Sequence, residues 1–332
     1  MNLPHEMTLI EITEPGGPNV LQPRQVAVPT AAAGEVLIRV MAAGVNRPDV
    51  IQRTGKYPMK PGMSLIPGLE VSGVVVAVGD DVSEFVVGDK VCALTNGGGY
   101  AQYCVTPASQ TLPIPEGMDW NQAAAIPETF FTVWANLFDM GGAVKGQRVL
   151  IHGGTSGIGT TALMLCQAFG IEAFATAGSE KKCAAIQALG AHAINYREQD
   201  FAHVIAQTTA NKGVDVILDI MGASYLNQNI SALSMEGRLV LLGFLGGAHA
   251  NDVDLLAIMA KRATITGSLM RSRTQAEKAV IAQHLREHVW PLLTAGRCLP
   301  IIDRVYRLTD AAQAHARMEG GDHIGKIVLQ MT

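Results

Sequence analysis

The spacing of hydrophobic and polar positions along this chain changes near Trp120. Before that residue, short β-branched runs such as 35–40 and 71–78 lie between turn signals rich in glycine, aspartate and proline, which is typical of short strands. After it, the pattern predicts a helical stretch over residues 121–138, and strand-like and helix-like segments then alternate. We therefore predict a β-rich N-terminal part followed by an α/β part.

The α/β part shows its periodicity most clearly in its first two strand–helix pairs. Residues 148–152 predict a buried strand, and the apolar side chains of residues 158–169 recur at the spacing of an amphipathic helix. Strand 172–176 and helix 181–189 follow, and a glycine stands directly after each helix, where it favours a helix end. Later elements are expected at 193–196, 214–220 and 238–243 (strands), at 274–293 (a helix) and at 327–329 (a strand-like run that could rejoin the β-rich part). The nearly continuous apolar strands favour a parallel sheet covered on both faces.

A glycine-rich turn joins the first predicted strand of this part to its helix. Its sequence, Ile151-His-Gly-Gly-Thr-Ser-Gly-Ile-Gly159, contains Gly154, Gly157 and Gly159 and departs from the G-x-G-x-x-G spacing. The physical argument is unchanged, because glycines let backbone N–H groups approach a diphosphate and the following helix directs its N-terminus at the anion. Together with the strand–helix–strand order, the turn predicts a dinucleotide site; the alternative is a plain turn.

The end of the second strand indicates which dinucleotide is bound. An NAD site usually carries an acidic residue there for the ribose 2′-hydroxyl, whereas this strand runs into small residues and then Lys181 and Lys182. The lysines favour the 2′-phosphate of NADPH, although Glu180 stands close to the acidic position, and two solvated lysines in a first helical turn are the alternative. Tyr196, which closes the third strand, is expected near the adenine end; its alternative role is a partly buried edge residue.

Composition narrows the class of protein. The 332 residues are 48% hydrophobic and 16% charged, with a formal net charge of −4, which suits two globular domains and gives no basic patch for nucleic acid or anionic lipid. No apolar run reaches the length of a membrane span, and the glutamate-containing N-terminus is not expected to be a signal peptide. The five cysteines are dispersed, so we expect no disulfide framework, no zinc knuckle and a cytoplasmic location.

Several segments of the sequence resemble the zinc-free quinone oxidoreductase branch of the medium-chain dehydrogenase/reductase superfamily, the zeta-crystallin-like enzymes, and most of all its stress-inducible type. These segments span nearly the whole chain and lie at residues 43–49, 52–57, 67–73, 87–91, 152–159, 190–196 and 324–328. The resemblance implies an α/β fold in which a Rossmann doubly wound parallel sheet is inserted in a β-rich GroES-like domain. The implied GroES-like catalytic domain is residues 1–123 with a C-terminal return at 296–332, the Rossmann NADP-binding domain is residues 124–295, and the active-site cleft lies between the two.

The resemblance also bears on metal binding. Related zinc alcohol dehydrogenases bind the catalytic metal through a cysteine at the position of Asn46 and a histidine at the position of Leu69. Neither residue here is such a ligand, and no cluster of histidines and cysteines replaces them. We therefore expect no metal. Without a Lewis acid, the reduction of an electron-poor acceptor is favoured over the oxidation of an alcohol.

Residue roles follow from the same resemblance. Tyr57 and Asn46 would be catalytic residues that face the nicotinamide and the acceptor, with Tyr57 donating a hydrogen bond or proton to the reduced oxygen or serving only as an aromatic wall. Residues expected to bind NADPH are Asn46, Thr132, Gly154, Ser156, Gly157, Ile158, Lys181, Tyr196, Phe244, Leu245, Ser268, Leu269 and Lys326. Backbone N–H groups of residues 156–158 would hold the diphosphate, and Lys326 could instead be a solvated lysine at a strand end. Some relatives carry a second tyrosine where this chain has Ile51, so a quinone site built on two tyrosines is in doubt.

These inferences predict a zinc-independent, NADPH-dependent enzyme that transfers hydride to a quinone. The first alternative is an NADPH-dependent reductase of enone or enal double bonds, and the second, from another class, is an NADPH-binding protein with little catalysis. The expected partner is a small-molecule electron acceptor, with no nucleic acid and no membrane. The resemblance further implies a homodimer joined through an edge strand near residues 263–269.

Overall fold

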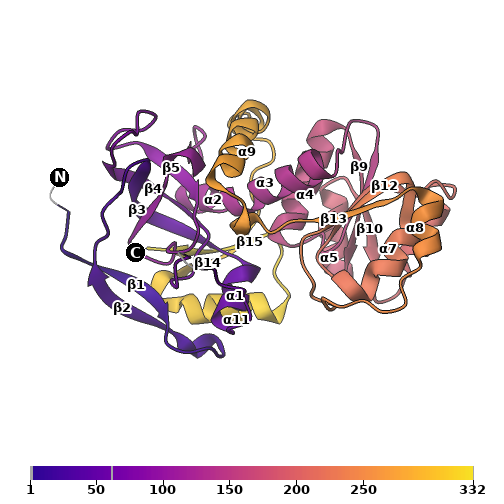
Figure 1. Ribbon diagram of the computed structural model, residues 1–332, viewed down its shortest axis with the longest axis horizontal. Coiled ribbons are helices and arrows are strands. Elements are labelled where there is room, and N and C mark those ends of the chain that lie inside the picture. Colours follow the sequence, from indigo (N-terminus) through magenta and orange to yellow (C-terminus); the bar gives the residue numbers. More distant parts are fainter. Residues whose placement is uncertain (1–2, 61–62, 332) are drawn as a thin grey trace. The chain divides into compact units, whose positions relative to one another are not determined.

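The computed structural model describes residues 3–60 and 63–331, which form two compact units. Unit 1 takes its described residues from Met1–Phe131 and Arg273–Thr332, and unit 2 is Thr132–Ser272. The chain therefore begins in unit 1, builds the whole of unit 2 and then returns to unit 1, in the manner of an inserted domain. In Figure 1 unit 2 is the part coloured from magenta to orange.

Unit 2 is built on a six-stranded sheet whose paired strands are all parallel. Its strands are β8 (Arg148–Ile151), β9 (Glu172–Ala177), β10 (His192–Asn195), β11 (Val214–Asp219), β12 (Leu233–Leu241) and β13 (Thr264–Gly267). They lie in the order β10-β9-β8-β11-β12-β13. This is the doubly wound Rossmann order, which reverses between β8 and β11, and such sheets bind ligands at the carboxyl ends of the strands beside that reversal.

The helices of unit 2 connect these strands. They are α4 (Gly157–Phe169), α5 (Glu180–Ala188), α6 (Phe201–Thr208), α7 (Leu226–Ala232) and α8 (Leu255–Lys261), with 3-10 turns η4 (Gly222–Tyr225) and η5 (Met270–Ser272). Helix α4 ends at Gly170, whose φ of 70° is left-handed, so the glycine predicted to end this helix does so for a conformational reason. Side chains such as Phe174, Ile217 and Leu239 form one buried cluster of the unit.

The helix predicted over residues 121–138 is interrupted. It consists of α2 (Trp120–Ala124), α3 (Pro127–Val133) and a π-helix, η3 (Trp134–Met140). Pro127 causes the first break, because it has no N–H to donate and restricts the residue before it. The hydrophobic spacing does not reveal either change, since the apolar positions continue through all three pieces.

Unit 1 is built on a seven-stranded sheet in the order β14-β15-β3-β4-β5-β7, with β6 also paired to β3. Its strands are β3 (Glu35–Val45), β4 (Glu70–Val78), β5 (Lys90–Leu94), β6 (Tyr103–Pro107), β7 (Thr111–Pro113), β14 (Ile302–Arg307) and β15 (Lys326–Gln330), and a separate hairpin joins β1 (Glu6–Ile12) to β2 (Leu21–Ala27). The C-terminal strand β15 pairs antiparallel with β3, which confirms that the strand-like run at 327–329 rejoins the β-rich part.

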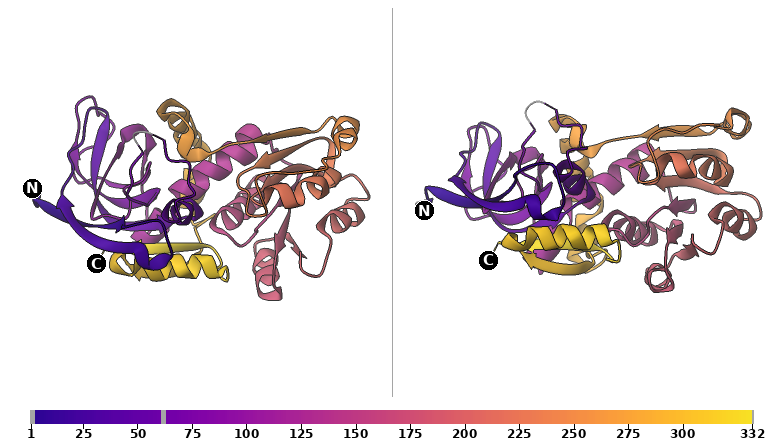
Figure 2. Two further views of the ribbon diagram at one scale, coloured as in Figure 1. Left: turned by 60° about the horizontal axis from the view of Figure 1, so that its bottom comes forward. Right: turned by 90° about the horizontal axis from the view of Figure 1, so that it is seen from below.

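Unit 1 also contains helices outside this sheet. They are α1 (Arg47–Arg53), α9 (Gln275–His288), α10 (Trp290–Thr294) and α11 (Ala311–Gly320), with 3-10 turns η1 (Pro18–Val20), η2 (Ala108–Gln110) and η6 (Leu308–Asp310). Figure 2 shows α11 lying along β14 and β15. Ala311, Ala314 and Met318 of this helix are buried in the main core of the unit.

The bounds of the two units differ from the boundaries expected at residues 124 and 295. The larger difference is α9, which belongs to unit 1. Lys278 Nζ of α9 donates to Asn96 Oδ1 at 2.6 Å, and Trp290 Nε1 donates to a carbonyl oxygen of β7 at 2.8 Å. These contacts join residues far apart in the sequence, so no local pattern could place the second boundary.

The helix predicted over residues 274–293 is also divided. Thr274 caps α9 and forms a reciprocal capping box with Glu277. The helix ends at His288, and α10 begins at Trp290 with Pro291 in its first turn, where a proline has no N–H to continue the preceding helix. Within residues 3–60 and 63–331, no helix combines the length and the apolar composition needed to cross a bilayer.

Candidate active site

The turn between β8 and α4 needs its glycines for space. A Cβ on Gly154 would lie 2.6 Å from the Ala175 side chain, and one on Gly159 would lie 2.3 Å from the Gly153 carbonyl oxygen. Gly153 itself has a φ of 73°, which favours glycine. The loop is therefore packed close to β9 and to itself, at the reversal of strand order where a dinucleotide is expected to bind.

Ser156 holds this turn together from inside. Its Oγ accepts a hydrogen bond from Gly159 N at 3.0 Å and donates one to the Gly153 carbonyl at 2.8 Å, while its own N–H donates to the same carbonyl at 3.0 Å. The predicted use of the Ser156 N–H for the diphosphate therefore competes with the turn. Gly157 and Ile158 are the first two residues of α4, where an N–H has no helical partner.

His152 at the end of β8 is an internal group. Its ring is 1% exposed and lies 3.1 Å from Thr176 Oγ1 and 2.7 Å from Asn229 Oδ1. Because Asn229 Oδ1 only accepts, His152 Nε2 carries the proton and Nδ1 accepts from Thr176. Burial lowers the pKa of His152 to about 4, so the ring is neutral at physiological pH and braces β8 against β9 and α7.

Beyond β9 the structure brings Tyr196 against Gly178. A Cβ on Gly178 would lie 2.5 Å from the Tyr196 hydroxyl oxygen, and the Tyr196 side chain is 45% exposed. Ser179 caps α5 by accepting from Lys182 N at 3.4 Å, and Lys181 is exposed in the first turn of this helix. An exposed phenol, a cation and a helix N-terminus thus share one end of the sheet.

Three polar residues of unit 2 meet around the π-helix. Asn136, 0% exposed, donates from Nδ2 to the Thr132 carbonyl at 2.7 Å and accepts from Ser268 Oγ at 2.8 Å. Thr132 Oγ1 is buried without a hydrogen-bond partner among the described residues. The structure therefore brings together Thr132 and Ser268, which the sequence placed together by resemblance alone, and adds Asn136.

Apolar residues predicted to line the nicotinamide are exposed. Phe244, Leu245 and Leu269 are 53%, 55% and 47% exposed. The loop that carries Phe244 and Leu245 follows β12 and is tied to the end of β11, because Leu245 N donates to the Ile220 carbonyl at 3.0 Å. These side chains lie at the carboxyl ends of the parallel strands, so they stand on the ligand-binding edge of the sheet.

In unit 1, Asn46 lies in a buried polar cluster. Its Oδ1 is 2.5 Å from Lys326 Nζ, and its Nδ2 donates to Glu70 Oε1 at 2.9 Å. Lys326 Nζ also lies 2.6 Å from Glu70 Oε1 and 3.2 Å from the Val45 carbonyl oxygen. Lys326 is 4% exposed, which rules out the alternative of a solvated strand-end lysine.

Glu70 and Glu128 extend this cluster. Glu70 is 0% exposed, and its Oε2 accepts from Glu128 N at 2.8 Å. Burial, with a further contribution from the negative charge of Glu70, raises the pKa of the Glu128 carboxyl to about 8. It is Glu70, through Oε1, that pairs with the Lys326 ammonium. Sequence reasoning missed both residues, although an acid between Leu69 and the apolar run that starts at Val71 was a signal for Glu70.

A second network of hydrogen bonds, centred on Asp49, fixes the backbone of Asn46. Asp49 accepts from Asn46 N at 2.9 Å and from Gly68 N at 3.0 Å, and the Tyr100 hydroxyl lies 3.2 Å from Asp49 Oδ2. The Tyr100 hydroxyl is also 3.0 Å from the His315 ring. The backbone of Asn46 is thus fixed by buried groups of α1, the loop before β4 and α11.

Tyr57 lies in the loop after α1, where its side chain is partly buried. Its carbonyl accepts from Met59 N at 2.8 Å, which turns the chain sharply at this point. Ile51, on α1, is partly exposed and has no polar group for an acceptor. The catalytic role of the Tyr57 hydroxyl therefore stays a prediction.

The residues at the two expected ligand positions, Asn46 and Leu69, are neither cysteine nor histidine. Among the described residues, no group of three or more His, Cys, Asp or Glu side chains could hold a metal ion. Leu69 is an apolar residue, 2% exposed, and the Asn46 and Glu70 oxygens are bound to an ammonium instead. The residues of this cluster therefore do not fit zinc, which prefers thiolate, imidazole and free carboxylate ligands.

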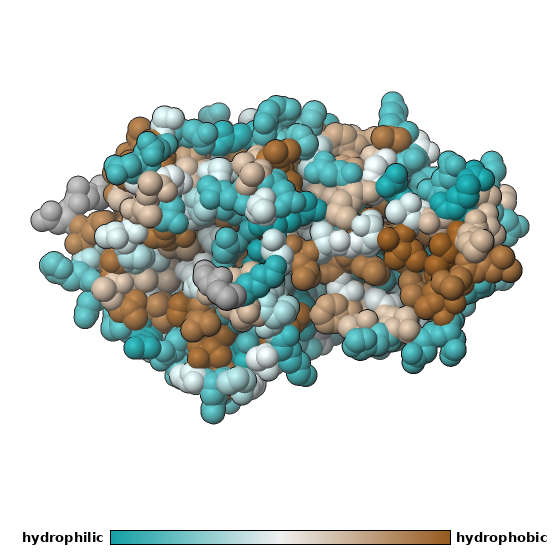
Figure 3. All heavy atoms as spheres, viewed as in Figure 1, coloured by the Kyte–Doolittle hydropathy of each residue, from teal (hydrophilic) through white to brown (hydrophobic). Residues whose placement is uncertain are grey.

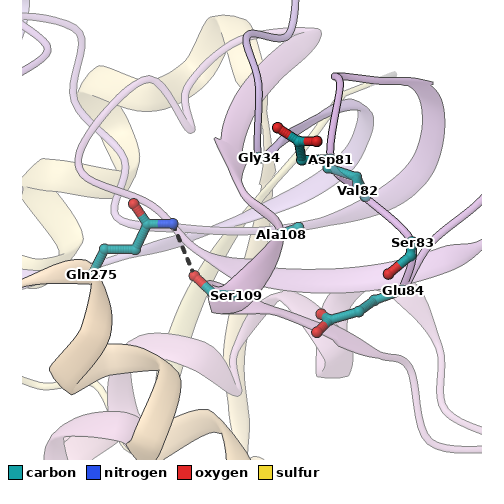
Figure 4. A pocket seen from close by; sticks show the side chains of 8 residues that line it. All are labelled: Gly34, Asp81, Val82, Ser83, Glu84, Ala108, Ser109 and Gln275. Carbon is teal, nitrogen blue, oxygen red and sulfur yellow. Dashed lines mark hydrogen bonds between the residues drawn. The ribbon is translucent and has the colours of Figure 1, made fainter.

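A separate hollow of about 200 Å³ lies on unit 1. It is lined by Gly34, Asp81, Val82, Ser83, Glu84, Ala108, Ser109 and Gln275. Figure 4 shows Gln275 reaching Ser109, with an Nε2–Oγ distance of 3.1 Å. None of the predicted site residues lines it, so we do not assign it to catalysis.

The site can now be compared with known proteins. A family model described as an alcohol dehydrogenase GroES-like domain matches residues 32–116, and one described as a zinc-binding dehydrogenase matches residues 189–329. The quinone oxidoreductase of Rattus norvegicus is 35% identical over 327 residues, which are 97% of this chain and 97% of that protein. This chain belongs to the medium-chain dehydrogenase/reductase superfamily. It is an oxidoreductase of the quinone oxidoreductase type, and unit 2 is its nicotinamide-cofactor-binding domain.

Solved structures of the superfamily cover nearly the whole chain. An NAD-dependent alcohol dehydrogenase is 30% identical, with a TM-score of 0.85 over 98% of this chain and 100% of that chain. A mycobacterial protein complexed with NADPH is 29% identical, with a TM-score of 0.85 over 98% of this chain and 99% of that chain. The two differ in the cofactor that their names give, so cofactor preference has to be argued from this chain's own residues.

Proposed function

We propose that this oxidoreductase transfers hydride from NADPH to a quinone without a metal ion. The observation that carries the proposal is the buried cluster of Asn46, Glu70 and Lys326, in which an ammonium occupies the oxygens that might have served a metal. An enzyme that lacks a Lewis acid is suited to acceptors that are already electron-poor, and quinones are such acceptors.

The choice of NADPH rests on the end of β9. The strand ends at Ala177 and leads into Gly178 and Ser179, so no carboxylate stands at its tip for a ribose 2′-hydroxyl. Lys181 is exposed and available to a 2′-phosphate, with which an ammonium forms a charge-assisted hydrogen bond. Tyr196 beside Gly178 supports a place for the adenosine.

The other residues of unit 2 fit a dinucleotide. The N–H groups of Gly157 and Ile158 would hold the diphosphate at the start of α4, in a turn where a Cβ on Gly154 or Gly159 would meet its neighbours. The buried Thr132 hydroxyl lacks a partner among the described residues and would bind the nicotinamide ribose. When bound, NADPH supplies the hydride.

The residues of unit 1 would orient the acceptor. Tyr57 would donate a hydrogen bond, or a proton, to the quinone oxygen that gains negative charge. Asn46, whose amide is fixed by Glu70 and Lys326, would provide a rigid wall for the reacting ring. A fixed arrangement of this kind lowers the entropy that must be lost when the two reactants meet.

The test is oxidation of NADPH and NADH by purified protein with ortho-quinones, para-quinones and short enones. We expect turnover of quinones with NADPH, slower turnover with NADH, and no loss of activity after dialysis against a chelator. Preferred turnover of enones would favour the double-bond reductase instead. Tight NADPH binding with no turnover of either class would favour a binding protein. If the purified protein contains one zinc ion per chain, and a chelator removes both the zinc and the activity, the metal-free reaction is contradicted.

We also propose that the protein forms a homodimer through β13. This strand is at one end of the sheet order, so its outer N–H and C=O groups are free for a partner strand. Leu255, Leu256 and Met259 of the neighbouring α8 are 67%, 73% and 72% exposed, and Figure 3 shows an apolar surface over α8. An apolar patch next to an unpaired strand edge supports burial by a second copy.

A further inference from the structure

Lys326, a buried lysine of unit 1, is positioned by the pairing of two strands. Lys326 is the first residue of β15, and β15 pairs with β3 so that Ile327 lies opposite Val45. Gly44 of β3 makes room for the acid, because a Cβ there would lie 2.0 Å from Glu70 Oε1. The backbone thus creates the space in which a lysine and a glutamate meet away from water.

The Lys326 ammonium makes two hydrogen bonds and one ion pair inside unit 1. Its Nζ donates to Asn46 Oδ1 at 2.5 Å and to the Val45 carbonyl at 3.2 Å, and it lies 2.6 Å from Glu70 Oε1. These partners come from the same unit and leave Lys326 only 4% exposed. Lys326 is therefore engaged within unit 1, and we infer an internal role for it in place of the cofactor contact that the resemblance gave it.

By the resemblance, the related zinc enzymes carry ligands at the positions of Asn46 and Leu69. In this chain Lys326 Nζ contacts Asn46 Oδ1 directly, and Leu69 is apolar. We propose that Lys326, Glu70 and Asn46 form a built-in ammonium site that takes the place of a metal ion and fixes the Asn46 amide for the acceptor. Lys326 and Glu70 are then positioning residues, and this inference rests on the proposed quinone reduction.

The geometry explains how the site fixes Asn46. Because Lys326 can only donate, the Asn46 oxygen must face it, and the Asn46 Nδ2 group is left to donate to Glu70. Lys326 and Glu70 form an ion pair, and each buried oxygen of Glu70 also accepts a hydrogen bond, Oε1 from Asn46 Nδ2 and Oε2 from Glu128 N, which is the condition for a buried ion pair to be tolerated. Loss of either charged partner would leave the other unpaired and free the amide to rotate.

The experiment uses three variants of the full chain: Lys326→Met, Glu70→Gln and the double variant. Urea unfolding, NADPH affinity by fluorescence titration and quinone turnover are measured for each. We expect each single variant to unfold at lower urea and the double variant to lose less than the sum, because the pair is removed together. In Lys326→Met we expect kcat to fall about tenfold or more while the Kd of NADPH stays within about twofold.

Lys278→Met is the matched control, since Lys278 is also a buried lysine of unit 1, at 1% exposure. It should lower stability and leave kcat within about twofold. NADPH binding weakened in Lys326→Met with kcat intact would make Lys326 a cofactor ligand and overturn the proposal, as would strictly additive stability losses or one bound zinc per wild-type chain. If the wild type reduces no quinone, the proposed function fails, and the unfolding measurements still test the ammonium site.

Discussion

A buried polar side chain whose hydrogen bonds are all made within the protein has none left for a ligand. By this criterion His152 and Lys326 are internal groups, since every donor and acceptor atom of their charged or polar ends has a partner. Thr132 and Lys181 differ, because one is a buried hydroxyl without a partner among the described residues and the other is exposed. Capacity for new hydrogen bonds therefore separates the residues that stabilise each unit internally from those that can still bind a ligand.

The charge of Lys181 gives a prediction at the residue scale. Lys181→Ala should weaken NADPH binding by about 1.5–3 kcal/mol, or roughly tenfold to a hundredfold, because one charge-assisted hydrogen bond to the 2′-phosphate is lost. The affinity for NADH should hardly change. Fluorescence titration with both nucleotides measures this, with Lys212→Ala, another exposed lysine of unit 2, as the control. Equal losses for both nucleotides would remove Lys181 from the 2′-phosphate site.

The turn and helix that follow β8 act as one element. The cap by Ser156, the left-handed Gly153 and the close contacts of Gly154 and Gly159 all fix the direction of the first turn of α4. Gly159 is the most demanding of them, because its missing side chain lets the helix approach the Gly153 carbonyl. The loop is therefore specified by packing as much as by its predicted contact with a diphosphate.

Gly159→Ala should disrupt this element. Its Cβ would lie 2.3 Å from a backbone oxygen that has no free rotation to give way, so we expect a loss of stability of about 1–3 kcal/mol and a large loss of NADPH affinity. Thermal unfolding and nucleotide titration measure the two effects. Gly17→Ala is the control, because nothing lies within 4 Å of its Cβ position. Normal binding by Gly159→Ala would show that the first turn of α4 does not hold the diphosphate.

His152 connects three elements, and its titration predicts a pH dependence. Burial lowers its pKa from 6.5 to about 4 in the folded protein, so the stability of the neutral ring is present above pH 6.5 and is lost as the pH falls toward 4, by about 1.4 kcal/mol per pH unit. Gln at this position can still donate to Asn229 but takes up no proton. The free energy of unfolding of wild type, minus that of His152→Gln, should therefore decrease between pH 6.5 and 4.

Urea unfolding at several pH values tests this expectation. The control is His203→Gln, which removes a histidine that is exposed on α6 and not buried. A difference between wild type and His152→Gln that stays constant from pH 7 to pH 4 would mean that the ring is not held neutral by the fold.

At the scale of the whole molecule, a Rossmann unit is inserted into a β-rich unit, and each has its own core. The six-stranded sheet of unit 2 ends at β13, and α8, which precedes β13 in the sequence, carries exposed apolar residues. An isolated enzyme in water would leave this apolar surface hydrated, which is unfavourable. A second copy paired along β13 would bury it.

Met259→Asp should therefore convert a dimer to a monomer. The side chain is 72% exposed on α8, so the charge costs little in the single chain, whereas burial of an unpaired carboxylate in a dimer interface is costly. Light scattering coupled to size-exclusion chromatography measures the mass. Val144→Asp, at a 58% exposed residue elsewhere on unit 2, should leave the dimer unchanged. A wild-type protein that is monomeric at micromolar concentration would contradict the interface.

The sequence by itself determined the elements whose signals are local. The parallel strands of unit 2, the glycine that ends α4 and the strand-like run that forms β15 all follow from apolar periodicity and turn chemistry in a few neighbouring residues. Its glycine-rich turn also indicated where a dinucleotide could bind, since the reason for those glycines lies within the turn.

Only the tertiary structure decided the remaining features, because they depend on residues far apart in the chain. Glu70 and Lys326 lie far apart in the sequence, and no residue near either one indicates that they share a buried polar cluster with Asn46. Asn136 reaches Ser268 in the same way. Long-range packing also assigned α9 to unit 1. Local patterns specify which elements form, whereas burial and pairing across the fold decide which polar groups meet.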